Sequence, residues 1–408
     1  MKLIVAVVTA WLLWFLSGIF LKNFWEKGLK VSLSFTENGV VEGQQAALKE
    51  IITNNKFLPL PVLHVKFQMG RELVFTDSNN FKITDHNYRS DIFSCMPWQE
   101  IRRTLTFTCT KRGYYSIHQA DLISYDLFLF RRFVAHRPVD TAMYVYPAPI
   151  DPLGLDLPLR ELLEQVLLRR ALLRDPFEMQ SIRPYQSFDT YRDINWKATA
   201  RTGNLKVNVY APTSSWQVTF LLDISSDLVR KDHGLTEEAI RLCGSMASQL
   251  LERGIPVSIR TNGIDCLSHK PGFLKNGAGP EHLRSVMELL ARILTDGACE
   301  NPDWFLLGGM ALWETPAFSG PDSADPLSAG LPGASVPDPA DSSSPDTTLY
   351  VLISPKQWES LASSYDSLCL NSPGSQWILP MRPGDALRIS EHLHCAKLIP
   401  WEVPYDYS

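Results

Sequence analysis

Two hydrophobic patterns divide the chain into an amino-terminal part with short alternating strands and a carboxyl-terminal part with apolar strands and helices. From about residue 28 to residue 147, segments such as 31–35 alternate apolar and polar residues, as half-buried strands do. Turn sequences such as Asn54-Asn55 separate these segments, and no long helical period occurs among them. This pattern predicts a small antiparallel β-sandwich.

The carboxyl-terminal part alternates between strands and helices. Residues 216–223 form a continuous apolar strand that ends in Asp223, and residues 236–253 carry an apolar stripe at helical spacing. Further apolar strands and amphipathic helices follow, and they predict a parallel sheet with helices on both faces. A segment at 316–346 contains no Lys or Arg and is dominated by Pro, Ser, Ala, Gly and Asp, so we expect a disordered loop there.

An amphipathic helix and a dense run of charges connect the two parts. Residues 155–174 place leucines on one helical stripe, and residues 183–210 place seven charged side chains around three tyrosines and a tryptophan. The predicted domains are a membrane anchor at 1–24, the β-sandwich at 25–150, the linker helix and charged junction at 151–212, and the α/β domain at 213–408.

The first residues form an apolar run long enough to cross a membrane. Leu3–Leu21 carries no charge and lies between Lys2 and Lys22. At about 1.5 Å per residue, a helix of this length spans about 28 Å, close to the hydrocarbon thickness of a bilayer. We therefore expect one transmembrane helix, with a cleaved signal peptide as the alternative. The lysines that follow it favour a cytoplasmic body, and hence a single-pass protein of the cell membrane.

Composition and charge exclude some functions. The formal net charge of −5 gives no basic excess, so we expect no binding of nucleic acid. The seven cysteines include no C-x-x-C pair, which favours free thiols in a reducing compartment. His392 and His394 lie on one face of a predicted strand beside Cys395, but no second cluster accompanies them to complete a zinc site.

The charged run carries a specific resemblance to a known family. RPYQSFDTYRDINWKATARTGNLKV, at 183–207, resembles the central signature of the proteins catalogued as domain of unknown function 58. KRGYYSIHQADLISYDLFLF at 111–130 and VTFLLDISSD at 218–227 resemble two further segments of that family. Phe188 stands where the family has a glycine. The signature residues that we single out for interaction are Arg183, Tyr185, Asp189, Arg192, Asn195, Trp196, Lys197 and Arg201.

The resemblance implies both a fold and a function. The implied fold class is an α/β von Willebrand factor A-like (Rossmann-like) domain preceded by a small antiparallel β-sandwich and one transmembrane helix. The implied function is that of a membrane-anchored, non-enzymatic adaptor for a MoxR-type AAA+ ATPase, often alongside a transglutaminase-like membrane protein. Such systems are thought to assist the assembly or maturation of other proteins.

A metal site is implied by the same resemblance. Von Willebrand A domains bind a divalent cation through D-x-S-x-S after the first strand, and Asp223, Ser225 and Asp227 occupy those positions here. Carboxylate and hydroxyl oxygens suit Mg²⁺, but the last Ser is replaced by Asp227, so we expect a degenerate site. In the alternative, Asp223 caps a loop and binds no metal. A complete metal site would instead indicate a metal-dependent binding module at the cell surface.

Three interpretations of the charged run remain open. In the first, the charges pair internally, because unpaired charges in a buried junction are costly, and Trp196 forms the apolar wall between the domains. In the second, Arg and aromatic side chains form a docking surface for another protein. In the third, Arg183, Arg192 and Arg201 bind phosphate or a nucleotide, although no GxxxxGK[ST] phosphate loop accompanies them, and the chain would then be an enzyme.

Overall fold

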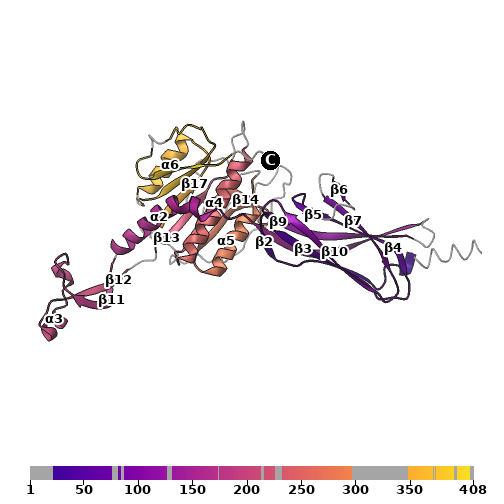
Figure 1. Cartoon of the computed structure of the whole chain (residues 1–408), viewed down its shortest axis with the longest axis horizontal. Coiled ribbons are helices and arrows are strands. Elements are labelled where there is room, and N and C mark those ends of the chain that lie inside the picture. The colour runs from indigo at the N-terminus through magenta and orange to yellow at the C-terminus, as the bar shows by residue number, and fades with distance from the viewer. Residues whose placement is uncertain are drawn as a thin grey trace, which may run out of the picture. The chain divides into compact units, whose positions relative to one another are not determined.

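The computed structural model describes residues 22–75, 81–83, 87–125, 131–172, 174–212, 216–225, 232–295, 348–370, 372, 374–389 and 393–404. The chain divides into two compact units, Met1–Ala148 and Pro149–Ser408 (Figure 1). Their division falls close to residue 150, where the alternating pattern of the sequence ends.

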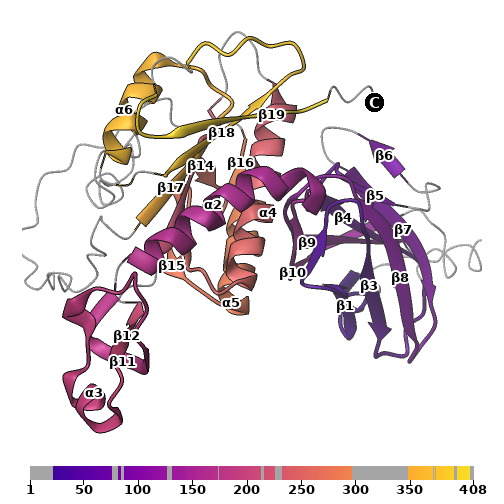
Figure 2. The same cartoon turned by 60° about the vertical axis from the view of Figure 1, so that its left-hand side comes forward.

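The first unit is a β-sandwich of two sheets (Figure 2). One sheet has the order β1 (Leu29–Phe35), β3 (Gln45–Asn54), β8 (Glu100–Cys109) and β5 (Leu73–Phe75), with antiparallel pairing throughout. The other has the order β2 (Gly39–Val41), β10 (Arg132–Tyr146), β9 (Gly113–Tyr125), β4 (Leu60–Met69), β7 (Asn87–Cys95) and β6 (Phe81–Ile83), with only the β2–β10 pair parallel.

The core of the sandwich comes from the inward positions of both sheets. Leu48 on β3 and Phe107 on β8 are fully buried, as are Val65 on β4 and Leu122 on β9. Successive residues of a strand point to opposite faces, so the alternation of the sequence places one apolar row of each strand in this core.

The second unit is built on a sheet with a parallel centre. Strands β14 (Val257–Asp265), β13 (Gln217–Leu222), β17 (Thr348–Ile353), β18 (Gln376–Met381) and β19 (Lys397–Glu402) are parallel neighbours in that order. Strands β15 (Pro271–Gly277) and β16 (Ile293–Leu294) pair with β14 in antiparallel register. The unit also contains the helices α2 (Pro152–Leu172), α4 (His233–Glu252), α5 (Pro280–Arg292) and α6 (Glu359–Cys369).

Helices cover both faces of this sheet. Phe220 and Leu222 of β13 share a core with α2, α4 and α5, whereas Leu221 of the same strand packs in a second core with Tyr365 of α6 and Trp377 of β18. Every residue of β13 is buried, which explains its mainly apolar sequence.

The charged run folds as a small hairpin within the second unit. Strands β11 (Arg174–Pro184) and β12 (Lys206–Pro212) pair in antiparallel register, and the 3₁₀ helix η1 (Tyr191–Asp193) and α3 (Trp196–Thr202) lie between them in the chain. Asn195 caps the start of α3, and Gly203 ends it with φ +73°, a conformation that favours glycine. We refer to residues 174–212 as the signature hairpin.

The expected fold class is wrong. Strand makes up 47% of the structure and helix 25%, so the protein is mainly β and is not an α/β von Willebrand factor A-like chain. The expectation gave most weight to the alternating strands and helices of the carboxyl-terminal half. The strands of the sandwich, together with the β11–β12 and β14–β15 pairs, make strand more abundant than helix.

The expected membrane location is corrected as well. In the part of the chain that the structure describes, no helix has the length and apolar character needed to cross a membrane. Leu3–Leu21, on which the transmembrane prediction depended, lies outside the described residues, and so does the predicted loop at 316–346. A single-pass protein of the cell membrane with a cytoplasmic body therefore has no support in the structure.

Candidate functional site

Asp223 lies directly after β13, buried among hydrogen-bond donors. Its Oδ1 atom accepts hydrogen bonds from the amide of Ser225 at 3.0 Å, the hydroxyl of Ser225 at 2.5 Å and Nδ2 of Asn262 at 2.7 Å. Its Oδ2 atom accepts a hydrogen bond from the hydroxyl of Ser354 at 2.8 Å. Asn262 belongs to β14 and Ser354 follows β17, so three neighbouring parallel strands contribute to this cluster.

This cluster satisfies Asp223 through neutral donors. A hard cation such as Mg²⁺ is bound by several oxygen ligands, usually including carboxylates, whereas the contacts of Asp223 described above are N–H and O–H groups. The residues that the structure describes contain no group of three or more His, Cys, Asp or Glu side chains that could hold a metal ion. Asp227 lies outside them. The observed bonds fit a structural role for Asp223, and the Mg²⁺ site stays a prediction.

Some signature residues shape the hairpin itself. Arg183 and Asp189 form a two-point ion pair, with Nη1–Oδ2 and Nη2–Oδ1 distances of 2.7 and 2.5 Å. Oδ2 of Asp189 also accepts a hydrogen bond from the amide of Gln186 at 2.8 Å. Asn195 accepts a hydrogen bond from the amide of Ala198 and donates one to Oδ1 of Asn208 at 2.7 Å. These polar residues therefore fix the local fold.

Other signature residues face solvent. Trp196 is 67% exposed, and Tyr191 and Phe188 are each 76% exposed. Tyr185 is half-buried because its ring stacks on that of Tyr191, with centroids 6.2 Å apart. The junction interpretation required Trp196 to be buried as an apolar wall, and its exposure contradicts that requirement.

Three cations of the signature are also exposed: Arg192, Lys197 and Arg201. No ion-pair partner for them is found among residues 174–212 or elsewhere in the described chain. The structure thus separates the signature into a bonded group, which builds the hairpin, and an exposed group of aromatic and cationic side chains.

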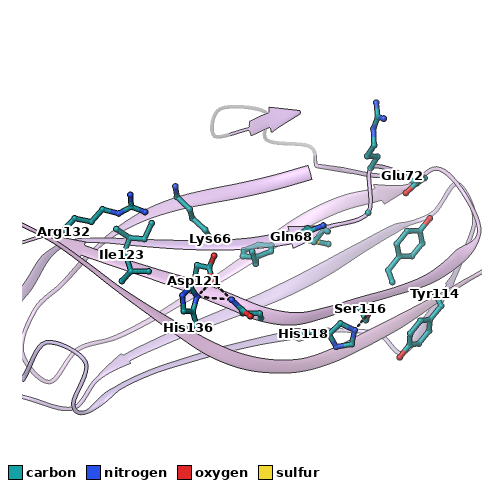
Figure 3. A pocket seen from close by; sticks show the side chains of 17 residues that line it. Lys66, Gln68, Glu72, Tyr114, Ser116, His118, Asp121, Ile123, Arg132 and His136 are labelled. Atoms are coloured by element: carbon teal, nitrogen blue, oxygen red, sulfur yellow. Dashed lines mark hydrogen bonds and ion pairs between the residues drawn. The ribbon is translucent and has the colours of Figure 1, made fainter. Parts of the chain in front are cut away.

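A groove of about 1030 Å³, which no sequence motif marks, lies on the outer face of the sandwich (Figure 3). Lys66 on β4, Asp121 on β9 and His136 on β10 are register partners in one row across its floor. Nδ1 of His136 lies 2.7 Å from Oδ1 of Asp121, and Nε2 of Gln119 donates to the same oxygen at 2.8 Å. Partial burial alone would raise the pKa of Asp121, but these hydrogen bonds and the charge of the nearby Lys66 outweigh burial and lower the pKa.

The neighbouring row of the groove floor is mainly apolar. Ile123 of β9 is paired with Val134 of β10 on one side and with His64 of β4 on the other. Burial, together with the charges of Lys66 and Arg132, lowers the pKa of His64. Outward positions of half-buried strands normally read as solvated surface, so only the gathering of His, Asp and Lys at such positions could have revealed this groove.

The last predicted cluster is not assembled in the described residues. His392 lies outside them, while the amides of His394 and Cys395 donate hydrogen bonds to Oδ1 of Asp366 at 3.1 and 2.6 Å. The segment thus binds α6 through its backbone.

Comparisons with known proteins leave the family open. No family model and no curated protein matches the chain, so membership of the domain of unknown function 58 family stays a prediction without support from these searches. Similar solved structures are the CARDB domain of PF1109 from Pyrococcus furiosus, a non-cellulosomal cohesin from Archaeoglobus fulgidus and PapD-like domain 7 of human CEP192.

These likenesses are remote. Sequence identities to this chain are 14, 9 and 12%, TM-scores are 0.19, 0.20 and 0.18, and the matches cover 28, 28 and 29% of this chain. They cover 94, 91 and 86% of the three other chains. TM-scores this low carry no functional argument.

Proposed function

We propose that this chain is a non-enzymatic interaction protein and that the signature hairpin binds an acidic surface of its partner. The proposal depends on one observation, the set of exposed aromatic side chains next in sequence to cations that form no ion pair with the described residues. Phe188, Tyr191 and Trp196 are all at least 67% exposed. Aromatic and arginine side chains provide most of the binding energy in protein interfaces, and a group of them open to solvent is typical of a docking surface.

The charge of the hairpin supports an acidic partner. Residues 174–212 contain six Lys and Arg against four Asp and Glu, a net of +2, although the whole chain carries −5. Arg183 and Asp189 neutralise each other, which leaves Arg192, Lys197 and Arg201 as exposed positive charges. Charges at the rim of an interface mainly steer association and select partners of opposite sign.

The class of partner comes from the resemblance of the signature alone. It implies a MoxR-type AAA+ ATPase, with a transglutaminase-like protein as a further component. In this proposal the chain links the ATPase to a client protein whose assembly or maturation the ATPase drives.

The test is direct binding of the purified chain to a purified MoxR-type ATPase, measured by biolayer interferometry with ATP, with ADP and without nucleotide. We expect Trp196→Ala and Arg192→Glu each to weaken binding by about tenfold or more. Matched controls are Trp98→Ala, whose side chain is 70% exposed in the sandwich, and Lys49→Glu at an exposed position of β3.

Three outcomes distinguish the parts of the proposal. Loss of binding in the hairpin variants alone supports it. Binding that is equally strong in all variants rejects the hairpin as the surface. Absence of binding in every nucleotide state rejects the ATPase as the partner.

A further inference from the structure

We infer that the groove on the outer face of the sandwich binds an extended, acidic polypeptide segment. This site is separate from the signature hairpin and does not depend on the function proposed for it. The argument combines the spacing of the rows on the groove floor with their charge.

The groove follows the direction of the strands. Figure 3 shows its labelled side chains spread along the sheet, with Arg132 at one end and Tyr114 at the other. On β9, the lining positions run from Tyr114 to Ile123, a distance of about 30 Å at about 3.3 Å per residue. A groove of that length accommodates an extended segment of about nine residues.

The rows of the floor repeat at the interval of an extended peptide. Arg132, Val134 and His136 alternate along β10 and all line the groove. Outward residues two positions apart on a strand are about 6.7 Å apart, and same-face side chains of an extended ligand have the same spacing. Successive rows can therefore contact alternate ligand side chains.

The chemistry of each row specifies what the ligand presents. Arg132 is exposed, and no ion-pair partner for it occurs among the described residues, so the first row suits a carboxylate. The next row consists of Ile123 and Val134, the latter 46% exposed, and suits an apolar side chain. In the third row, His136 and Gln119 bind Asp121 directly, whereas Lys66 forms no ion pair within the described residues and can receive a second carboxylate.

These rows together describe a ligand pattern. It is an acidic residue, then an apolar residue two positions later, then a second acidic residue after two more. The charged residues of the floor are consistent with it, since Lys66, Arg71 and Arg132 outnumber Glu72 and Asp121. Sugar units in a polysaccharide repeat at a different interval, so an acidic peptide is favoured over a glycan.

The experiment uses the full chain and a fluorescein-labelled peptide, SSDSVSESS, with fluorescence anisotropy as the readout. A second peptide, SSKSVSKSS, carries lysine at both acidic positions. We expect the acidic peptide to bind, to bind more weakly as salt is raised, and to lose about tenfold or more in affinity with Arg132→Glu or Lys66→Glu. Lys49→Glu on the other sheet of the sandwich is the matched control and should leave the affinity unchanged.

Other results would overturn the inference. These are equal binding of the two peptides, no binding of the acidic peptide, an unchanged affinity in both groove variants, or binding of an acidic hexasaccharide in preference to the peptide. Circular dichroism of each variant establishes that it is folded. Trp196→Ala should not alter peptide binding, so a failure here is distinguishable from a failure of the hairpin proposal.

Discussion

Glu50 on β3 and Arg103 on β8 are direct register partners, yet neither carboxylate oxygen of Glu50 receives a hydrogen bond from the described residues. Arg103 instead donates across the sandwich to Oδ1 of Asp91 at 3.0 Å, and Arg89 donates to Oδ2 of Asp91 at 2.7 Å. Two arginines therefore donate hydrogen bonds to Asp91, while Glu50 is buried without a donor among the described residues. Burial, followed by the charge of Asp91, raises the pKa of Glu50 to about 7.

Replacing Glu50 with Gln should flatten the pH dependence of the sandwich's stability. A carboxyl whose pKa is higher in the folded state than in the unfolded state stabilises the fold fully below about pH 4.5, and this stabilisation is lost as the pH rises to about 7. The free energy of unfolding falls by about 3 kcal/mol at most. Hydrogen exchange of the β3 and β8 amides at pH 5 and pH 8 measures it. Glu100→Gln, at an exposed site on β8, is the control, and an equal pH effect in wild type and Glu50→Gln would contradict the assignment.

Asp232 should show the opposite pH dependence. It caps α4 through the amides of Gly234 and Leu235, and Nε and Nη2 of Arg382 bind its two oxygens at 2.8 and 2.7 Å. The hydrogen bond from Arg382 is the main cause of its lowered pKa. The stabilisation that comes from the ionised Asp232 is therefore present above about pH 4, and it is lost as the pH falls through the pKa of the folded state.

The variant Asp232→Asn tests this relationship, because Asn caps a helix about as well as Asp but cannot form the ion pair. We expect faster hydrogen exchange at the start of α4 at pH 7, and a difference from wild type that shrinks as the pH falls below about 4. Glu252→Gln, at the other end of α4, should change neither. A difference that stays constant as the pH falls would show that the ion pair is not its cause.

Local patterns in the sequence were informative where burial follows a simple period. Strand β3 alternates buried and partly exposed residues along its length, whereas β13 is buried throughout. The sequence alone predicts both strands from these patterns, and it predicts the helices α4 and α5 from their apolar stripes. Strand pairing over long separations was not, because the register that joins Glu50 to Arg103 depends on the packing of the whole sandwich.

The sites were harder to predict than the strands. Trp196 reads as a core residue by its chemistry, but only the fold shows that α3 leaves it exposed. The sequence does not predict the groove, because His136, Asp121 and Lys66 are distant in sequence and meet only through the pairing of β10, β9 and β4. Asn262 and Ser354 carry no motif either, although they complete the bonding of Asp223.

Removing the carboxylate of Asp223 should destabilise the second unit. Asp223→Ala removes the buried acceptor of hydrogen bonds from Ser225, Asn262 and Ser354, at a cost of about 2–5 kcal/mol in the free energy of unfolding. Asp223→Asn should cost less, since its amide oxygen still accepts hydrogen bonds. Chemical denaturation measures the free energy of unfolding of both variants. Hydrogen exchange of the β13 and β14 amides shows whether the loss of stability lies in the second unit.

Magnesium distinguishes the two interpretations of Asp223. A cation that binds only the folded protein stabilises it by mass action, so a bound Mg²⁺ would raise the melting temperature of wild type but not of Asp223→Ala. Because neutral donors already bind the carboxylate, we expect no such difference. A magnesium-dependent shift that disappears in the variant would support the predicted metal site.

A larger residue at Gly263 on β14 should destabilise the second unit. A Cβ atom at this position would lie 2.5 Å from Cγ2 of Ile293 and closer still to Cδ1 of Ile224, and real Cβ atoms do not approach other atoms so closely. Gly263→Ala therefore forces these side chains apart, at a cost of about 1–3 kcal/mol.

Ile224→Val provides the matched test of that cost, because it removes the Cδ1 atom nearest to the added methyl group. In the double variant we expect part of the stability lost in Gly263→Ala to return, which appears as a favourable coupling energy in a double-mutant cycle of chemical denaturation. The contact with Ile293 remains, so recovery is incomplete. Strictly additive effects would show that the glycine is required for the backbone of β14 and not for the space beside Ile224.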